Sequence, residues 1–209
     1  MKISEILTET PYHHDGVMAR EKFGTSYTSD VSLERLYQEL GEIKAKDDVV
    51  RLYLQNTKDN VIGVIKREKP DTKVETNAMI FTLRFKKRNT IDKMPAELKG
   101  HDILQVTKVS IDPSYEGVGI ASLAYALLVA KGYVVISDSS QFTDGKMLWK
   151  KLAKEAKLKD YKVYILDDHY GFKKVGGKLV EYDASNIDNA DIWTKGEDLS
   201  GEHILLVMK

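Results

Sequence analysis

The sequence predicts an α/β or α+β fold in which helices pack against a sheet. Apolar residues alternate with polar ones in several stretches, such as "DVVRLYLQN" and "AMIFTLRFKK", and this alternation is typical of strands. Two later stretches have helical periodicity, and each is followed by an apolar, strand-like segment. The chain has 209 residues, of which 42% are apolar and 31% charged, enough for a globular domain with a core of its own.

The composition excludes several classes of protein. Lys and Arg number 32, as do Asp and Glu, and the formal net charge of zero argues against a general nucleic-acid binder. The absence of cysteine excludes disulfides, thiolate nucleophiles and Cys-based metal sites. The start, "MKISEILTET", lacks the apolar region of a secretory signal, and no run reaches the roughly 18 apolar residues of a membrane span. We therefore expect a cytoplasmic protein that does not enter a membrane.

The first 40 residues contain an arm and a helix. Residues 1–30 are polar and irregular, and we interpret them as an N-terminal arm. A helix is predicted over residues 32–40, where apolar side chains recur at helical spacing: Leu33, Leu36, Tyr37 and Leu40. Ser32 is placed to cap this helix and Gly41 to end it.

Four strands are predicted next. Residues 48–56 and 60–68 alternate, and the turn residues "TKDN" between them indicate an antiparallel hairpin. Residues 78–87 form the third strand, with one apolar face: Met79, Phe81, Leu83 and Phe85. Residues 103–111 form the fourth.

The second half of the chain alternates helices and strands. A helix that begins near residue 120 and ends at Gly132 has one apolar face: Ile120, Leu123, Ala124, Leu127 and Leu128. The apolar residues 133–137 read as a strand covered on both faces. A second helix over residues 145–157 directs four apolar side chains inward: Trp149, Leu152, Ala153 and Ala156.

Two more strands are predicted, at residues 161–168 and 202–209. The connection between them, residues 169–201, is longer than the connections usual in compact domains. We therefore expect this insertion to carry a hairpin or a functional loop.

The stretch "IDPSYEGVGIA", residues 111–121, places two glycines at the start of the first long helix. The unpaired N–H groups of a helix start and the positive end of its dipole can bind an anion, and glycines let a ligand approach the backbone. The pattern matches neither the Walker A motif nor the dinucleotide fingerprint. On spacing alone, a tight turn that only starts a helix is an equally good interpretation.

The same stretch resembles the acetyl-CoA-binding motif of the GNAT N-acetyltransferases, in which an apolar strand ending in Asp-Pro leads into a glycine loop and a helix. Nine residues match it: Val109, Ile111, Asp112, Pro113, Tyr115, Gly117, Gly119, Ile120 and Ala121. "VVISDSSQFTDGKMLWKKL" is also similar to phage-encoded GNAT-like proteins. The resemblance implies a mixed, mostly antiparallel central sheet flanked by helices, in a single domain over residues 31–209 with the insertion at 169–201.

The resemblance also implies a function and a site. Backbone N–H groups would bind the diphosphate of acetyl-CoA at five residues: Gly117, Val118, Gly119, Ile120 and Ala121. The strand edge at Val109 and Ile111 would hydrogen-bond the pantetheine arm. The chain would then transfer the acetyl group directly to an amine acceptor, in a ternary complex.

The sequence departs from the family pattern at three positions. Glu116 stands where the family has Arg or Gln, and Val118 where it commonly has Lys. Trp149 stands where many members have a Tyr that protonates the leaving thiolate, and indole has no proton to offer near neutral pH. We favour Trp149 as an anchor of the core.

Polar residues follow the strand 133–137: Ser137, Asp138, Ser139 and Ser140. Because the carboxyl ends of strands face the site in open α/β sheets, we select Asp138 as the catalytic base or the anchor of the substrate amine. Capping of a turn is an equally good role for it. Asp167, Asp168 and His169 could bind a metal or an amine, although such a run is more often a solvated strand end. His13 and His14 beside Asp15 are a weaker metal hypothesis, because they lack a spaced third ligand.

A second function stands beside the transferase. Glu116, Val118 and Trp149 favour a catalytically inactive GNAT-fold protein, structural or interacting, in a phage particle or bound to a host protein. Such a protein would reside in the cytoplasm of a bacterial host or in the virion. A long polar arm can wrap around a neighbouring subunit, so homo-oligomers are compatible with either function. A third reading, an unrelated nucleotide-binding protein, is supported only by the glycines.

Overall fold

A computed structural model describes residues 27–89, 91, 94–138, 143–187, 192 and 204–209. Residues 1–26 of the predicted arm, Ser139 and Ser140 lie outside these ranges. The chain divides into two compact units, one formed by Met1–Phe85 with Lys108–Leu127 and the other by Lys86–Thr107 with Leu128–Lys209. Mixed α and β structure is confirmed, and apart from one parallel pair all described strand registers are antiparallel.

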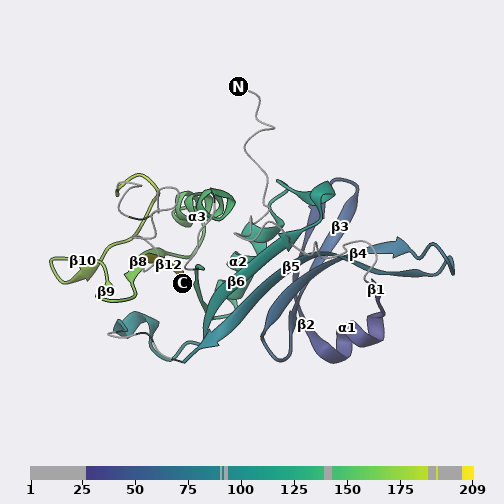
Figure 1. The fold of residues 1–209 in the computed structure, drawn as a ribbon, viewed down its shortest axis with the longest axis horizontal. Helices are drawn as coiled ribbons and strands as arrows, with labels where there is room; N and C mark the ends of the chain where they lie inside the picture. The colour runs from purple at the N-terminus through teal and green to yellow at the C-terminus, as the bar shows by residue number, and fades with distance from the viewer. Residues whose placement is uncertain (1–26, 90, 92–93, 139–142, 188–191, 193–203) are drawn as a thin grey trace, which may run out of the picture. The chain divides into compact units, whose positions relative to one another are not determined.

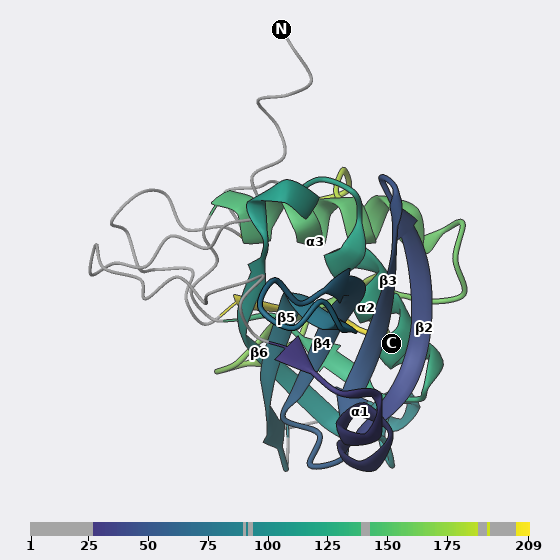
Figure 2. The ribbon, with the colours of Figure 1, turned by 90° about the vertical axis from the view of Figure 1, so that its right-hand side faces the viewer.

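The first unit is built on a sheet in the order β2-β3-β4-β5-β6, with β1 paired to β5. Its elements are β1 (Tyr27–Thr28), α1 (Asp30–Leu36), β2 (Tyr37–Ala45), β3 (Asp48–Gln55), β4 (Asn60–Glu68), β5 (Glu75–Arg88) and β6 (Ile103–Ile111), the last two continuing into the second unit. Figure 2 shows the paired β2 and β3, with α1 beside the start of β2.

The predicted hairpin is confirmed, since β3 and β4 pair antiparallel over Arg51–Leu54 and Val61–Val64. Its predicted inward residues are buried: Val50, Leu52 and Leu54. β5 extends beyond the prediction at both ends and buries residues on both faces, including Ile80 and Phe81. The alternation therefore located the strand, but it did not indicate that both faces are covered.

The helix predicted over residues 32–40 is wrong in both boundaries. Ser29, not Ser32, is the N-cap, because its hydroxyl accepts a hydrogen bond from the Ser32 N–H at 3.1 Å. α1 ends at Leu36, and Gly41 lies inside β2 at a bulge. Residues 37–45 form a strand because they pair with β3, and this tertiary pairing overrides their helical spacing.

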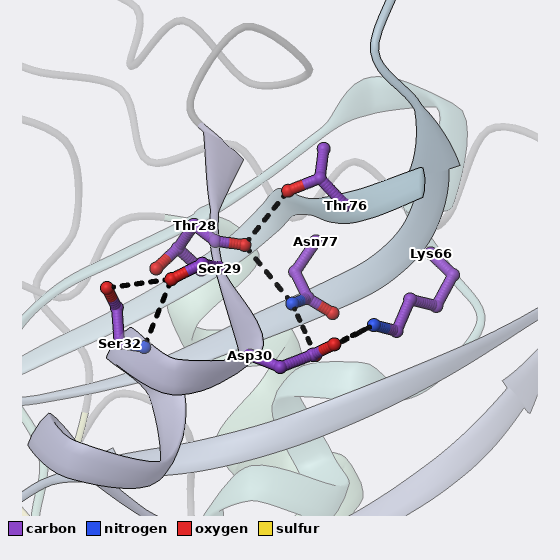
Figure 3. A network of polar contacts seen from close by, with 7 residues as sticks. All are labelled: Thr28, Ser29, Asp30, Ser32, Lys66, Thr76 and Asn77. Atoms are coloured by element: carbon purple, nitrogen blue, oxygen red, sulfur yellow. Dashed lines mark hydrogen bonds and ion pairs between the residues drawn. The ribbon is translucent and has the colours of Figure 1, made fainter. Parts of the chain in front are cut away.

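A polar network holds α1 and β1 to the neighbouring strands (Figure 3). Asp30 is paired with Lys66 at 2.7 Å and accepts a hydrogen bond from the Asn77 amide at 2.9 Å. The Thr28 carbonyl accepts hydrogen bonds from the side chains of Asn77 and Thr76, each at 3.1 Å. Because Asn77 is only 1% exposed, its amide needs these partners.

The second unit is built on strands in the order β6-β7-β12-β8-β9. Its elements are the 3₁₀ helix η2 (Ala96–Leu98), β7 (Val134–Ile136), α3 (Thr143–Ala156), β8 (Val163–Asp167), β9 (Gly171–Phe172), β10 (Lys174–Val175), β11 (Lys178–Leu179) and β12 (Ile204–Met208). β6 and β7 pair in parallel, and β12 is antiparallel to both β7 and β8. Figure 1 shows α3 beside β8 and β12, and α3 contacts β8.

The described part of the insertion contains the expected hairpin. β10 and β11 pair antiparallel, and the two residues between them, Gly176 and Gly177, both have positive φ angles of 58° and 79°. A two-residue hairpin turn of this kind needs positive φ at both positions, which glycine adopts without steric cost.

α2 (Ile120–Ala130) runs through both units. Its fully buried residues are Ile120, Ala121, Ala124, Tyr125 and Leu128. The predicted inward residues Leu123 and Leu127 are only half-buried, so the buried face is rotated from the predicted one. The helix ends before Gly132, whose φ is 90°, as predicted.

Candidate functional site: the glycine loop

The turn into the glycine loop is fixed by a side-chain cap. The carboxylate of Asp112 accepts a hydrogen bond from the Ser114 N–H at 2.9 Å and starts the 3₁₀ helix η3 (Pro113–Tyr115). The Asp112 N–H donates to the Ile80 carbonyl at 2.8 Å, which ties the end of β6 to β5. Asp-Pro thus ends the strand and sets the direction of the loop.

Both loop glycines have backbone angles that favour glycine. The φ of Gly117 is 75° and that of Gly119 is 89°, in the region that side-chain-bearing residues rarely occupy. The predicted tight turn is therefore confirmed. It is also the geometry that a backbone anion site requires, so the turn alone does not distinguish the two roles.

α2 begins directly after the loop, at Ile120. The Leu123 N–H donates to the Gly119 carbonyl at 3.0 Å, so the amides that precede Leu123 have no partner within the helix itself. Ser122, also in this first turn, is 4% exposed, and its hydroxyl has no hydrogen-bond partner among the described residues. Sequence reasoning did not single out Ser122, because a serine in an apolar helix face is unremarkable until its burial is known.

Tyr115 anchors the loop to distant strands. Its side chain is 2% exposed, and its hydroxyl donates to the Asp48 carboxylate and accepts from the Arg67 guanidinium at 2.9 Å. Burial, together with Asp48, raises the pKa of the Tyr115 hydroxyl, and Arg67 acts in the opposite direction. The hydroxyl therefore stays protonated at neutral pH and serves as a hydrogen-bond bridge.

Two cations flank this tyrosine. The Lys46 ammonium lies 5.9 Å from the Tyr115 ring centroid, and the Arg67 guanidinium carbon lies 6.0 Å from it. Tyr115 directly precedes Glu116, one of the three positions where the family's usual side chain is missing. Positive charge is thus present beside Tyr115, from the β2–β3 turn and from β4. Because these residues are far from the loop in sequence, the spacing of residues within the loop could not predict them.

The other predicted cofactor residues lie on β6 and in the loop. Ile111 is 3% exposed and Val109 is half-buried, as are Gly117, Val118 and Gly119. All of these residues belong to the first unit.

The predicted base, Asp138, belongs to the second unit. It is half-buried and follows Ser137, which is fully buried. The Ser137 N–H donates to the Leu206 carbonyl at 2.8 Å, and the Ser137 hydroxyl accepts from the Leu206 N–H at 3.0 Å. The hydrogen bonds of Ser137 thus join the end of β7 to β12. Asp138 lies just past the end of β7.

Trp149 is part of the core, as predicted, and is 2% exposed beside Leu152 and Ala153. The Asp167 carboxylate accepts hydrogen bonds from the N–H groups of His169 and Tyr170, at 2.9 and 3.0 Å, so it caps a turn. Within the described ranges no three His, Asp or Glu side chains are grouped to hold a metal ion. His13 and His14 lie outside those ranges.

Comparisons of the chain with models of known families, with curated proteins and with solved structures found no match. The likeness to GNAT acetyltransferases therefore rests on the residues of the motif themselves. In the part of the chain that the structure describes, no helix combines the length and apolar character needed to cross a bilayer.

Proposed function

We propose that this chain binds acetyl-CoA at the glycine loop and transfers the acetyl group to an amine. One observation carries the proposal: Gly117 and Gly119 both have positive φ, between an Asp-Pro-capped strand end and the first residue of α2. This arrangement leaves backbone N–H groups at the positive end of a helix, which favours a diphosphate.

The charge of the loop is compatible with such a ligand. Two charges about 4 Å apart interact by about 1 kcal/mol in water and about 4 kcal/mol at an effective dielectric constant of 20, so Glu116 would oppose a diphosphate unless other charges offset it. Lys46 and Arg67 lie beside Tyr115 in the same unit, where the Asp48 carboxylate offsets one of the two charges and the other opposes Glu116. The backbone amides would then hold the ligand.

The transfer needs three contributions. Bound acetyl-CoA supplies an activated acetyl group. The acceptor amine must be neutral to attack the thioester. Asp138, past the end of β7, accepts the proton that the attacking amine loses, or orients the amine. The buried Trp149 donates no proton, so the leaving thiolate takes its proton from water.

A catalytically inactive GNAT-fold protein is the second candidate. The burial of Trp149 in the core favours it, because the position that many GNAT acetyltransferases use for a proton donor has a structural role here. Such a protein would keep the scaffold for structure or interaction, for instance in a phage particle, against a host protein or in a homo-oligomer.

Thermal unfolding with and without acetyl-CoA tests the proposal. At 100 times the dissociation constant the ligand should stabilise the chain by about 2.7 kcal/mol. Gly119→Asp should abolish the shift, because it adds a carboxylate to the anion site, whereas Val118→Ala should retain it. Gly100→Asp is the matched control: Gly100 also has a positive φ, 83°, with nothing within 4 Å of an added Cβ, so its strain should lower the melting temperature and leave the ligand shift intact.

No shift at millimolar acetyl-CoA would overturn both binding and transfer. A shift without release of free CoA thiol across a panel of amines would support the inactive protein. If transfer is observed, Asp138→Asn should lower the rate while the acetyl-CoA shift remains.

A further inference from the structure

The β10–β11 hairpin of the second unit carries positive charge without an acid of its own. Residues 169–180, which contain the hairpin, include three lysines and no aspartate or glutamate. Lys173, Lys174 and Lys178 are all exposed, and their ammonium groups have no hydrogen bond or ion pair with the described part of the chain. The formal net charge of zero is an average over the whole chain, so it does not exclude a local excess of this kind.

The acids that adjoin the hairpin in sequence are engaged elsewhere. Asp168 is paired with Arg88, and Glu181 is paired with Lys162. Asp167 accepts hydrogen bonds from backbone N–H groups of the turn that follows it. The charges of the three hairpin lysines are therefore not neutralised by these neighbours.

Strand pairing determines which face of the hairpin is turned outward. Lys174 lies opposite Leu179, and Val175 lies opposite Lys178. Leu179 packs against the core of the second unit, so its face of the hairpin is the inner one. Because successive residues of a strand point to opposite faces, the outer face presents Lys173, Val175 and Lys178. Val175 is 70% exposed, as this assignment requires.

The hairpin is fixed at its base and open at its tip. At the base, the Lys173 N–H donates to the Ile165 carbonyl at 3.0 Å, and the Val180 N–H donates to the Lys173 carbonyl at 3.1 Å. At the tip, a Cβ added to Gly176 or Gly177 would have nothing within 4 Å. Figure 1 shows β10 and its turn at the outer edge of the second unit. The lysines are thus held on an ordered arm that a large partner can reach.

Tyr170 adds an exposed aromatic ring close to this arm. It lies in the turn between β8 and β9 and is 78% exposed. Proteins that bind single-stranded nucleic acid combine cations that follow the phosphates with aromatic rings that stack on the bases. Residues 169–180 contain both features in a short stretch of chain.

We propose that the β10–β11 hairpin binds single-stranded nucleic acid, with Lys173, Lys174 and Lys178 at the phosphates and Tyr170 stacked on a base. Lysine ammonium groups are common ligands of phosphate, and the closely spaced charges of a nucleic-acid strand complement a cluster of them. The inference is independent of acetyl-CoA binding, because it uses none of the residues of the glycine loop.

The tip of the hairpin favours a nucleic acid over an anionic membrane. A segment that binds at a lipid surface buries apolar side chains among the headgroups. Gly176 and Gly177 form the tip and have no side chain to insert there.

Fluorescence anisotropy of labelled oligo-dT and oligo-U, titrated with the full chain, tests the inference. Binding should be saturable, and with three phosphate contacts it should weaken roughly 20-fold between about 50 and 200 mM salt. Replacing the three hairpin lysines with alanine (Lys173→Ala, Lys174→Ala, Lys178→Ala) should abolish saturable binding. Tyr170→Leu should weaken binding by about fivefold or more, the loss expected for one stacked base, and should leave the salt dependence unchanged.

The matched control removes three lysines from α3 instead: Lys150→Ala, Lys151→Ala and Lys154→Ala. These lysines form no ion pair with the described residues, and their removal changes the net charge of the chain by the same amount. This variant should bind as the wild type does. Circular dichroism verifies that both triple variants are folded.

Four outcomes would overturn the proposal. The wild type could fail to bind either oligonucleotide at the lower salt concentration, or the hairpin variant could bind as well as the wild type. Equal losses in the hairpin and α3 variants would show that binding follows net charge and not the hairpin. Binding of phosphatidylserine vesicles through the hairpin lysines, without binding of either oligonucleotide, would assign this surface to a membrane.

Discussion

At the residue scale, Tyr115 shows how one side chain can connect a sequence motif to distant parts of the chain. Its ring is buried and its hydroxyl bridges Asp48 on β3 and Arg67 on β4. A hydrogen bond to a charged group contributes more than one between neutral groups, about 1.5–3 kcal/mol. The loop that follows Tyr115 is therefore held to two strands through a single oxygen atom.

Tyr115→Phe should destabilise the chain by about 1–2 kcal/mol, because it removes both hydrogen bonds and leaves the ring in place. Urea denaturation followed by circular dichroism measures this. Tyr170→Phe is the control, since Tyr170 is 78% exposed, and its midpoint should match that of the wild type. Equal midpoints for both variants would show that the hydroxyl of Tyr115 does not hold the loop.

The contacts of Asp30 make the stability of the folded chain depend on pH. Hydrogen bonds from Asn77 and Lys66 lower the pKa of this carboxyl below its ordinary value of 3.8. A lowered pKa in the folded state means that the contribution of Asp30 to stability is present above pH 3.8 and is lost as the pH falls through the lower, folded-state value.

Asp30→Asn should therefore reduce the acid dependence of the urea midpoint below about pH 4, since the variant has no carboxylate to protonate. Asp47→Asn is the control, because Asp47 is exposed and has no side-chain partner among the described residues. If both variants keep the wild-type acid profile, the network of Figure 3 is not responsible for it.

At the element scale, two glycines illustrate opposite consequences of the same substitution. Gly63 lies in β4 opposite Phe81, and a Cβ added to it would sit 2.9 Å from the Phe81 Cβ. Gly145 lies inside α3, and nothing is within 4 Å of its added Cβ. Close strand packing requires the first glycine, whereas helix propensity disfavours the second.

Gly63→Ala should destabilise the chain by about 1–3 kcal/mol, since the backbones must move apart. Gly145→Ala should stabilise it by about 0.5–1 kcal/mol, because alanine loses less freedom in a helix. Calorimetric melting of the pair measures both. A destabilised Gly145→Ala variant, or a neutral Gly63→Ala variant, would contradict the packing described for β4 and α3.

The boundary between α1 and β2 shows what the spacing of apolar residues cannot predict. Leu33 and Leu40 are both buried, as helical spacing predicted, yet Leu33 is in α1 and Leu40 in β2. Leu36, expected to face the core, is 48% exposed. Four apolar positions in nine residues fit a helix and a helix–strand junction equally well, and only pairing with β3 decides between them.

At the scale of the whole molecule, the residue pattern predicted mixed α and β structure, and the resemblance to GNAT proteins implied mostly antiparallel strands; both are confirmed. The arrangement specific to GNAT proteins and the transferase activity stay proposals. The strand hairpin over β3 and β4, the helix after the glycine loop and the burial of Trp149 followed from residue spacing and are confirmed.

The sequence by itself indicated the strands β3 to β8 and β12, the helices α2 and α3 and the tight glycine turn between β6 and α2, because alternation, helical periodicity and glycine's backbone freedom act between neighbours along the chain. Only the tertiary structure decided where α1 ends, which charges surround Tyr115, and that the buried Ser122 hydroxyl has no partner within the part of the chain that is described. Those features depend on residues that are far apart in sequence and are brought together only by strand pairing and packing.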